Sequence, residues 1–363
     1  MNQPFPVVSD LQSFIDALPD QQRRLCQRIF AVSVDKGTVE PPPKMVPWIE
    51  SQFGSLEMVT DQTIVKIYNL ITYEGSIFNT LRGVLAQNER KRFLNGAAPI
   101  DTILHKDAFD NPLERTPADV FGRVEGKHSI TAGNIAKFDA FHSVVIFKKV
   151  DPLNITAEEV ADHIDTGWRW AQEAHHYDPH AKYFSMLWNS GKRAGASMIH
   201  GHAHLALGRD MHYAKTEALR RVALGYKNTY GANYFDDLFE VYRSLGLGFE
   251  KDDTKMFVSL TPIKEKETAL LAPCFTDSFK QHIYDVIACF RDKLDVLTFN
   301  VGISAPPLGD VAEDWSGFPV IARIVDRGYP NNDSSDFGSV ELFAASVIHS
   351  DPFEVARALK NAS

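Results

Sequence analysis

Three histidines at alternate positions constrain this chain more than any other feature of its sequence. They are His200, His202 and His204, and they lie in the apolar run IHGHAHLALG. Alternate residues of a β-strand point to one face of a sheet, so the three imidazoles are predicted to line a single face. Polar rings on an apolar strand cost free energy unless they have partners or a chemical role. The pattern therefore indicates a site.

A glycine-rich loop leads directly into this strand. The segment NSGKRAGAS places glycines beside a serine and two cations. Glycine allows backbone N–H groups to approach phosphate oxygens, while a hydroxyl and a guanidinium add further donors. The spacing is not that of a Walker A loop, because arginine follows the Gly-Lys pair. We expect phosphate to be bound by Lys192, Arg193, Gly195 and Ser197. A family resemblance carried by the same segment adds Asn189, which would brace the loop or contact phosphate.

Four interpretations of the histidine strand remain open from the residues alone. The rings are structural histidines with satisfied hydrogen bonds, or a His-x-His pair binds a metal ion. Alternatively, the strand lines a binding pocket without turnover, or one imidazole attacks phosphorus as a nucleophile. The adjoining glycine-rich loop favours the nucleophile, because it supplies the donors that a phosphate would need.

The bulk composition limits the class of protein. A chain of 363 residues predicts two domains or one large domain. The net charge of -9 argues against a nucleic-acid or membrane-surface partner. The three cysteines form no Cys-x-x-Cys pair, so neither a disulfide scaffold nor a thiolate zinc site is expected. The N-terminus lacks the features of a secretory signal, and we expect a cytoplasmic protein.

The order of predicted elements repeats along the chain. A helix is expected over residues 10–34, broken by Pro19, and strands are expected between residues 61 and 83. Two later regions then share one order, which is helix, strand, Asn-x-Gly turn and strand. In the first region these elements cover residues 154–176, 182–191 and 199–208, and in the second they cover 276–295, 296–303 and 318–328.

This repetition suggests two related halves. We predict an N-terminal helical extension over residues 1–60, a first domain over 61–235 that carries the histidines, and a second domain over 236–363. The last strand of the second domain carries no histidine, so only the first domain is expected to perform the chemistry.

The histidine motif resembles that of the histidine triad (HIT) superfamily. The longer pattern, FHSVVIFKK, a helix and then WNSGKRAGASMIHGHAHLAL, resembles the branch that contains galactose-1-phosphate uridylyltransferase and the diadenosine tetraphosphate phosphorylases. GSIFNTLRG is similar to an Asn-Pro-Leu-Arg element of that branch, with Thr80 in place of proline. The segment DFGSVELFAASVIHSDPFEVARAL resembles its C-terminal part, so the likeness spans roughly residues 60–363.

The resemblance implies an α+β fold of tandem HIT-like domains, each an antiparallel sheet with flanking helices. It also implies a nucleotidyltransferase or phosphorylase that acts on a nucleoside di- or polyphosphate, or on a nucleotide sugar. His202 would be the nucleophile that forms a nucleotidyl-histidine adduct, with a backbone carbonyl of the same segment holding its other ring nitrogen. His200 would orient it or bind zinc, and Asn79 and Arg82 would face the nucleotide. Phosphate or a sugar phosphate would be the acceptor, and a homodimer is left open.

Two departures from the pattern of that branch keep alternatives open. The transferases carry glutamine where this chain has His204, which favours a nucleotide hydrolase instead. A nucleotide-binding protein without turnover is a third hypothesis. The Cys-x-x-Cys zinc pair is absent, and a divalent ion would have to be bound by Asp107, Asp110, His142 and His200. A solvated acidic loop is the commoner explanation for such carboxylates, and no cofactor is expected to be required.

Overall fold

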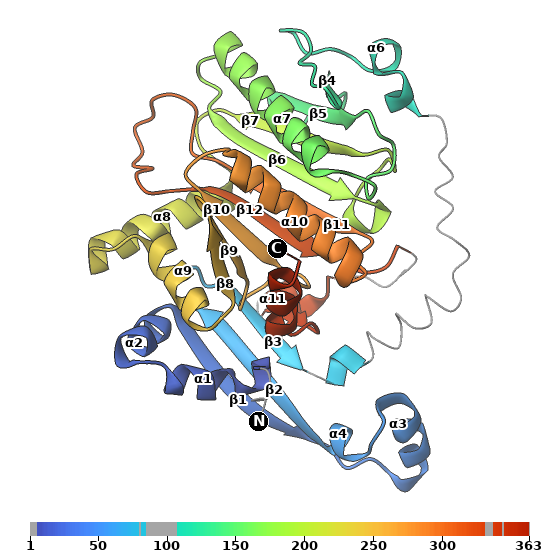
Figure 1. Cartoon of the computed structure of the whole chain (residues 1–363), viewed down its shortest axis with the longest axis vertical. Helices are drawn as coiled ribbons and strands as arrows, with labels where there is room; N and C mark the ends of the chain where they lie inside the picture. The colour runs from blue at the N-terminus through green and yellow to red at the C-terminus, as the bar shows by residue number, and fades with distance from the viewer. Residues whose placement is uncertain (1–5, 80, 85–106, 331–336, 343–344, 363) are drawn as a thin grey trace.

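The computed structural model describes residues 6–79, 81–84, 107–330, 337–342 and 345–362. Within these ranges the strands form a nine-stranded sheet and a four-stranded sheet. Figure 1 shows the larger sheet in the upper part of the molecule and the smaller one, built mainly from the N-terminal segment, beneath it. The larger sheet positions the histidines.

The nine-stranded sheet consists of two halves with the same topology. All its described strand pairs are antiparallel, and its order is β4-β5-β7-β6-β11-β12-β10-β9-β8. The order β4-β5-β7-β6 of the first half therefore recurs as β9-β10-β12-β11 in the second. The strands are β4 (Ser129–Gly133), β5 (Phe141–Phe147), β6 (Tyr183–Ser190), β7 (His202–Gly208), β8 (Gly248–Lys251), β9 (Thr254–Val258), β10 (Thr268–Ala272), β11 (Phe299–Ser304) and β12 (Val320–Asp326).

One long helix occupies the same place in each half. Helix α7 (Ala157–Tyr177) connects β5 to β6, and α10 (Asp277–Lys293) connects β10 to β11. The predicted capping box at the start of α7 is present, because Thr156 and Glu159 each accept a hydrogen bond from the other's backbone N–H. The expected α+β fold with two repeated halves, each an antiparallel sheet with flanking helices, is thus confirmed.

Helices α7 and α10 lie side by side across one face of the large sheet (Figure 1). The alternation predicted for the histidine strand holds, because Ala203 and Leu205 are fully buried in the core. Leu205 packs so closely on α7 that a Cβ added at Gly167 would lie 2.9 Å from its Cδ2 atom. Burial of such a side chain stabilises the fold by about 1.5–3 kcal/mol. The histidines consequently face the other side of the sheet.

The two halves meet at the seam between β6 and β11. These strands pair in antiparallel register, and Asn189 lies directly opposite Asn300. Each asparagine begins an Asn-x-Gly sequence, so the repeated turn signal marks equivalent positions in the two halves. The seam brings the predicted phosphate loop against the second half.

The structure of the N-terminal segment differs from the expected helical extension. Residues 1–60 were expected to form a helical extension, but β1 (Phe30–Thr38) pairs with β2 (Asp61–Asn69) over nine residues. Phe30, Val32 and Val34 alternate along β1 with less apolar residues, as a strand requires, but the predicted helix was extended over them to residue 34. The helices in this region are α1 (Leu11–Ala17), α2 (Asp20–Ile29), α3 (Val46–Phe53) and α4 (Glu57–Thr60), with the short η1 (Val8–Asp10) and η2 (Pro43–Met45).

The smaller sheet also includes the C-terminal part of the chain. Its order is β1-β2-β3-β13, in which β3 (Gly75–Asn79) pairs in parallel with β13 (Ser346–Ile348). The ion pair between Glu74 and Arg323, at 2.7 Å, joins this sheet to β12 of the larger one. The predicted strands of residues 61–83 thus belong to a separate sheet from the histidines. The domain boundaries remain predictions.

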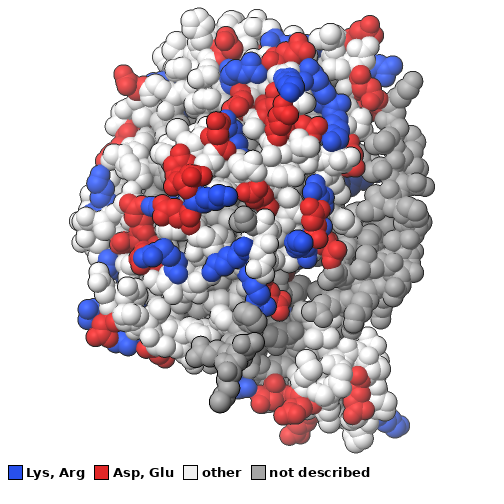
Figure 2. Space-filling view, viewed as in Figure 1, with Lys and Arg blue, Asp and Glu red and all other residues white. Residues whose placement is uncertain are grey.

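The remaining described elements surround these sheets. They are η3 (Ala108–Asp110), α6 (Pro112–Arg115), η4 (Lys192–Ala194), α8 (Ala214–Tyr230), α9 (Tyr234–Ser244), η5 (Ser339–Leu342) and α11 (Pro352–Lys360). No helix of the described ranges has both the length and the apolar character that a membrane span requires. On the face drawn in Figure 2, acidic and basic side chains are interspersed.

Candidate active site

The central histidine of the motif is oriented by its own backbone. His202 begins β7, and its Nδ1 lies 2.8 Å from the carbonyl oxygen of His200. A carbonyl can only accept, so Nδ1 carries the proton and Nε2 presents a lone pair. Burial lowers the pKa of His202, which favours the neutral ring. The imidazole is therefore held in the tautomer that a nucleophile needs.

Phe109 packs over this ring. Its ring centre lies 5.2 Å from that of His202 and 5.7 Å from that of His200, with an edge-on geometry in both cases. His202 has an exposed fraction of only 3%. The phenyl ring thus shields the His202 imidazole from water, and this contact was not predictable from the sequence, since Phe is common in the chain.

The glycine-rich loop turns sharply at two glycines. Gly191 and Gly195 have φ angles of 88° and 94°, which residues with a Cβ rarely adopt. At Gly191 a Cβ would also lie 2.8 Å from Cγ2 of Thr298, whereas Gly195 faces open space. Gly195 and Ser197 are exposed, and the Ser197 hydroxyl makes no hydrogen bond within the described part of the chain. These two residues are therefore open to solvent, and their contact with phosphate remains a prediction.

Residues of the second half hold this loop in place. Asn300 donates through Nδ2 to Oδ1 of Asn189 at 2.7 Å and to the carbonyl oxygen of Ala194 at 2.8 Å. Arg327 in turn donates to Oδ1 of Asn300. Arg193 donates from Nε to the carbonyl oxygen of Arg327 at 3.2 Å, so its predicted role toward phosphate competes with a structural one. The role of Asn300 was not predicted, although the repeated Asn-x-Gly sequence marks it as the counterpart of Asn189.

The third histidine has a different set of neighbours. His204 lies in register with Val144 of β5, and its Nδ1 is 3.0 Å from Nε2 of His142. Asn134 approaches the same Nδ1 with its side-chain nitrogen at 3.4 Å. Burial, followed by the neighbouring His202 and His142, lowers the pKa of His204 to about 4. His204 is consequently neutral near pH 7.

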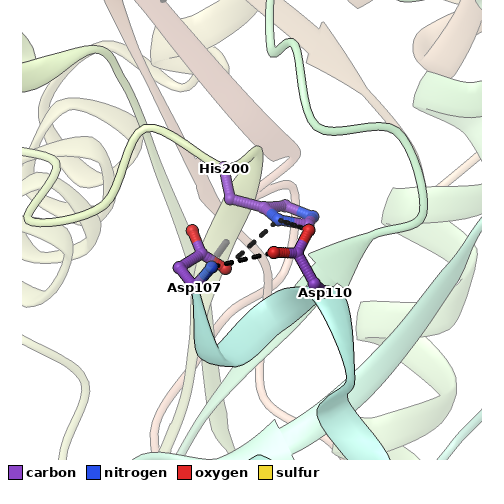
Figure 3. A group of neighbouring side chains, drawn as sticks. All are labelled: Asp107, Asp110 and His200. Atoms are coloured by element: carbon purple, nitrogen blue, oxygen red, sulfur yellow. Dashed lines mark hydrogen bonds and ion pairs between the residues drawn. The ribbon is translucent and has the colours of Figure 1, made fainter. Parts of the chain in front are cut away.

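A group of three residues has the character of a metal site. Asp107, Asp110 and His200 place one ligand atom each within 4.8 Å of the others. Figure 3 shows both carboxylates facing the imidazole, with Oδ1 of Asp107 3.4 Å and Oδ1 of Asp110 3.9 Å from Nδ1 of His200. Ligand atoms on one tetrahedral ion lie about 3.4 Å apart, given bonds of about 2.0–2.2 Å. The separation therefore suits a shared cation.

The hydrogen bonding of His200 supports the same conclusion. Its Nε2 lies 2.8 Å from the carbonyl oxygen of Phe147, so Nε2 carries the ring proton. Nδ1 is then a lone pair that faces two carboxylates, and it is buried without a hydrogen-bond partner among the described residues. An unpartnered buried acceptor beside two negative charges costs free energy unless a cation or an added proton lies between them.

Three predicted site residues lie elsewhere. His142 does not join the carboxylates, because its Nε2 faces His204, so its expected role as a metal ligand is not supported by this geometry. Asn79 lies at the end of β3 and donates to Gln62, and Arg82 follows it as an exposed residue. β3 and β7 belong to different sheets (Figure 1), and within the described ranges no hydrogen bond joins Asn79 or Arg82 to the histidines.

The fold is α+β with a tandem repeat, and solved structures share it. No family model matches the sequence, and no curated protein matches it either. An ADP-glucose phosphorylase from Arabidopsis thaliana with bound ADP-glucose matches 81% of this chain and 96% of its own, with a TM-score of 0.59 and 16% identity.

Two further structures show the same similarity. A GalT-like protein from Arabidopsis thaliana matches 71% of this chain and 93% of its own, with a TM-score of 0.58 and 16% identity. A uridylyltransferase matches 66% of this chain and 85% of its own, with a TM-score of 0.54 and 13% identity. At these identities the structural similarity establishes the fold alone. The resemblance inferred from the motifs is therefore confirmed for the fold.

Proposed function

We propose that the protein is a nucleotidyltransferase of the phosphorylase type, which forms a covalent nucleotidyl adduct on His202. The observation that carries the proposal is the hydrogen bond from Nδ1 of His202 to the carbonyl oxygen of His200. It leaves the Nε2 lone pair as the one reactive position of the ring. The exposed glycine-rich loop beside it supplies the donors for phosphate.

The reaction proceeds in two displacements at the α-phosphorus. Nε2 of His202 attacks phosphorus, the N–P bond forms, and the bond to the bridging oxygen breaks, so the distal phosphate departs with the electron pair. The adduct ring keeps its proton on Nδ1 and becomes cationic, and the carbonyl of His200 stabilises this charge. An oxygen of the acceptor then attacks phosphorus and releases the neutral imidazole.

The neighbouring structures support a substrate class. The protein named ADP-glucose phosphorylase is described with ADP-glucose bound, and another neighbour is named a uridylyltransferase. Nucleoside diphosphate sugars are therefore the first substrates to test, with inorganic phosphate or a sugar phosphate as acceptor. A hydrolase that uses water as acceptor is the second candidate, favoured by a histidine at position 204 in place of glutamine.

Steady-state kinetics with a panel of nucleoside diphosphate sugars and dinucleoside polyphosphates test the proposal. Parallel double-reciprocal plots for donor and acceptor are expected, as is exchange of the labelled sugar phosphate into the donor without an acceptor. His202→Asn should abolish both activities, whereas His175→Asn in the last turn of α7, which packs on the face of the sheet opposite to His202, should retain them. Turnover by His202→Asn, or release of nucleotide that needs no acceptor but water, would contradict a transferase.

We also infer that a divalent cation binds between Asp107, Asp110 and His200. The buried lone pair of His200 and the two facing carboxylates fit such an ion, which would supply positive charge that holds the turn of residues 107–110 against the histidine strand. Elemental analysis of the purified protein should find about one equivalent of metal, and a chelator should lower the melting temperature. Asp107→Asn should lose both effects, and the exposed Glu250→Gln should keep them. Metal-free protein with an unchanged melting temperature would overturn this inference.

A further inference from the structure

The reactive histidine of the proposed transfer is covered in this structure. His202 has an exposed fraction of only 3%, so no phosphate reaches its Nε2 unless a neighbouring side chain moves. Within the described ranges, the rings in contact with this imidazole belong to His204, on the same strand, and to Phe109, on the short turn η3. A central strand is held by hydrogen bonds on both sides, whereas a turn outside the sheet opens at lower cost. Phe109 is therefore the neighbour that gives way.

The turn that carries Phe109 touches the histidine strand through side chains alone. Among the described residues, no hydrogen bond joins positions 107–110 to β5 or β7. Inside the turn, Oδ1 of Asp107 accepts from the N–H of Phe109, and Oδ2 of Asp110 accepts from the N–H of Asp107, both at 2.8 Å. The turn can consequently move away from the strand as one piece, without loss of a hydrogen bond to the sheet.

Phe109 packs on an apolar seat beside His202. The seat is a buried cluster of β4 and β5 that is separate from the main core, and its members are Ile130, Ala132, Val144 and Ile146. Ile146 is the register partner of His202, so the seat lies on the histidine face of the sheet. When the turn lifts, the phenyl ring and the seat are both exposed to water. Burial of apolar surface therefore favours the closed position.

The burial of Phe109 sets a scale for this closure. Complete burial of a phenyl ring shifts an equilibrium by about 10–100-fold. Phe109 is half-buried, so its contact with the seat favours the closed turn by roughly tenfold. A ligand that prefers the open form can overcome such a bias, because its difference in affinity between the two forms shifts the equilibrium.

We propose that Phe109 is the gate to His202 and the residue that selects the acceptor over water. The proposal rests on the covalent adduct proposed above and adds what determines the fate of that adduct. A phosphate-bearing acceptor has binding energy toward the glycine-rich loop, which offsets the cost of moving Phe109, whereas water has none. The adduct is consequently protected after the first product departs and before the acceptor arrives.

The two fates of the adduct are the same displacement. An oxygen of the acceptor or of water attacks phosphorus, the N–P bond breaks, and its electron pair returns to Nε2 of His202. Inorganic phosphate gives the nucleoside diphosphate and a sugar phosphate gives the nucleotide sugar, whereas water gives the nucleoside monophosphate and releases a proton. Because only access to phosphorus differs, a change at Phe109 should alter the ratio of the products.

Chemical modification measures the opening without any substrate. Diethyl pyrocarbonate acylates neutral imidazoles that it can reach, and peptide mapping by mass spectrometry gives the rate at each histidine. The exposed His180 is the internal reference, and the core residue His163 reports global unfolding. In Phe109→Ala the rate at His202 should increase by about tenfold, while that at His163 stays low.

Two further variants control this measurement. Phe109→Leu keeps most of the apolar contact and should give a smaller increase, so it tests the gate even if the alanine variant folds poorly. Phe249→Ala removes another half-buried phenyl ring on β8, at the far edge of the large sheet, and should leave the rate at His202 unchanged. Equal rates at His202 in wild type and both Phe109 variants would overturn the proposal, whether or not the protein is a transferase. An equal increase at His163 would also contradict it, because it would show unfolding of the whole molecule.

The product ratio tests the selection of the acceptor. With a nucleoside diphosphate sugar and inorganic phosphate, the ratio of nucleoside monophosphate to nucleoside diphosphate should rise by about tenfold in Phe109→Ala and stay unchanged in Phe249→Ala. This ratio does not depend on the fraction of folded protein. An unchanged ratio despite faster modification of His202 would refute the selection against water. Absence of any adduct in the wild-type protein would instead refute the transferase, and the modification rates would still identify Phe109 as the gate.

Discussion

Replacement of Asn300 tests how far the second half of the molecule supports the chemistry of the first. The side chain makes two neutral hydrogen bonds to the loop and accepts one from Arg327. A neutral hydrogen bond contributes about 0.5–1.5 kcal/mol and one to a charged group about 1.5–3 kcal/mol. Asn300→Ala should therefore lower the free energy of unfolding by about 2.5–6 kcal/mol.

The same variant should slow the reaction. The carbonyl of Ala194 and the side chain of Asn189 lose their common donor, so the loop is no longer held beside His202. A displacement of about 1 Å at a reacting site costs on the order of 10²-fold in rate. Single-turnover formation of the adduct should thus be about 100-fold slower.

Two comparison variants separate the contributions. Asn300→Asp keeps an acceptor for Arg327, and Asn189 can reverse its amide to donate, but the carbonyl of Ala194 loses its donor. Its rate should lie between those of wild type and Asn300→Ala. Asn233→Ala, which removes the N-cap of α9 far from the loop, should reduce stability without slowing the adduct. An unchanged adduct rate in Asn300→Ala would refute the idea that the second half positions the loop.

Other predictions concern stability. Gly191→Ala should lower the melting temperature, because Gly191 has a φ of 88° and an added Cβ would lie 2.8 Å from Cγ2 of Thr298. Gly225→Ala, in open space on α8, should instead raise the free energy of unfolding by up to about 1 kcal/mol. Equal effects of the two variants in thermal melts would contradict this. Burial lowers the pKa of His163 to about 4 from 6.5, so the unfolded chain binds a proton first as the pH falls, and stability is lost from about pH 6.5 down to pH 4. Between pH 7 and pH 4, the free energy of unfolding of His163→Phe should fall by about 3 kcal/mol less than that of the wild-type protein, as measured by urea titration. The same pH dependence in both proteins would refute this assignment.

Local patterns in the sequence predicted much of the fold. The alternation around His202 placed Ala203 in the core and the imidazoles on the opposite face, because side-chain direction in a strand has a period of two. The spacing of Thr156 and Glu159 predicted the start of α7, because a capping box depends on neighbours within one turn. The tautomer of His202 was implied by the family resemblance, in which a backbone carbonyl of the same segment holds the other ring nitrogen.

Contacts between distant segments were not predictable from such patterns. The pairing of Asn189 with Asn300 depends on the register between two halves of the chain, and the sequence indicated only that the two turns are alike. The contact of His142 with His204 depends on the pairing of β5 with β7, so His142 was wrongly grouped with the carboxylates. Strand β1 was missed because it follows α2 without a connecting loop, so the predicted helix was extended to residue 34 over its first residues.

The central claim is that the Nε2 atom of His202 becomes bonded to phosphorus. The most direct measurement is rapid alkaline quenching of the protein with a nucleoside diphosphate sugar labelled at the α-phosphorus, followed by peptide mapping of the label. We expect an acid-labile, alkali-stable adduct on the peptide that contains His202, and none in His202→Asn. Turnover of the same substrate without a labelled peptide, or a label on another residue, would contradict the account.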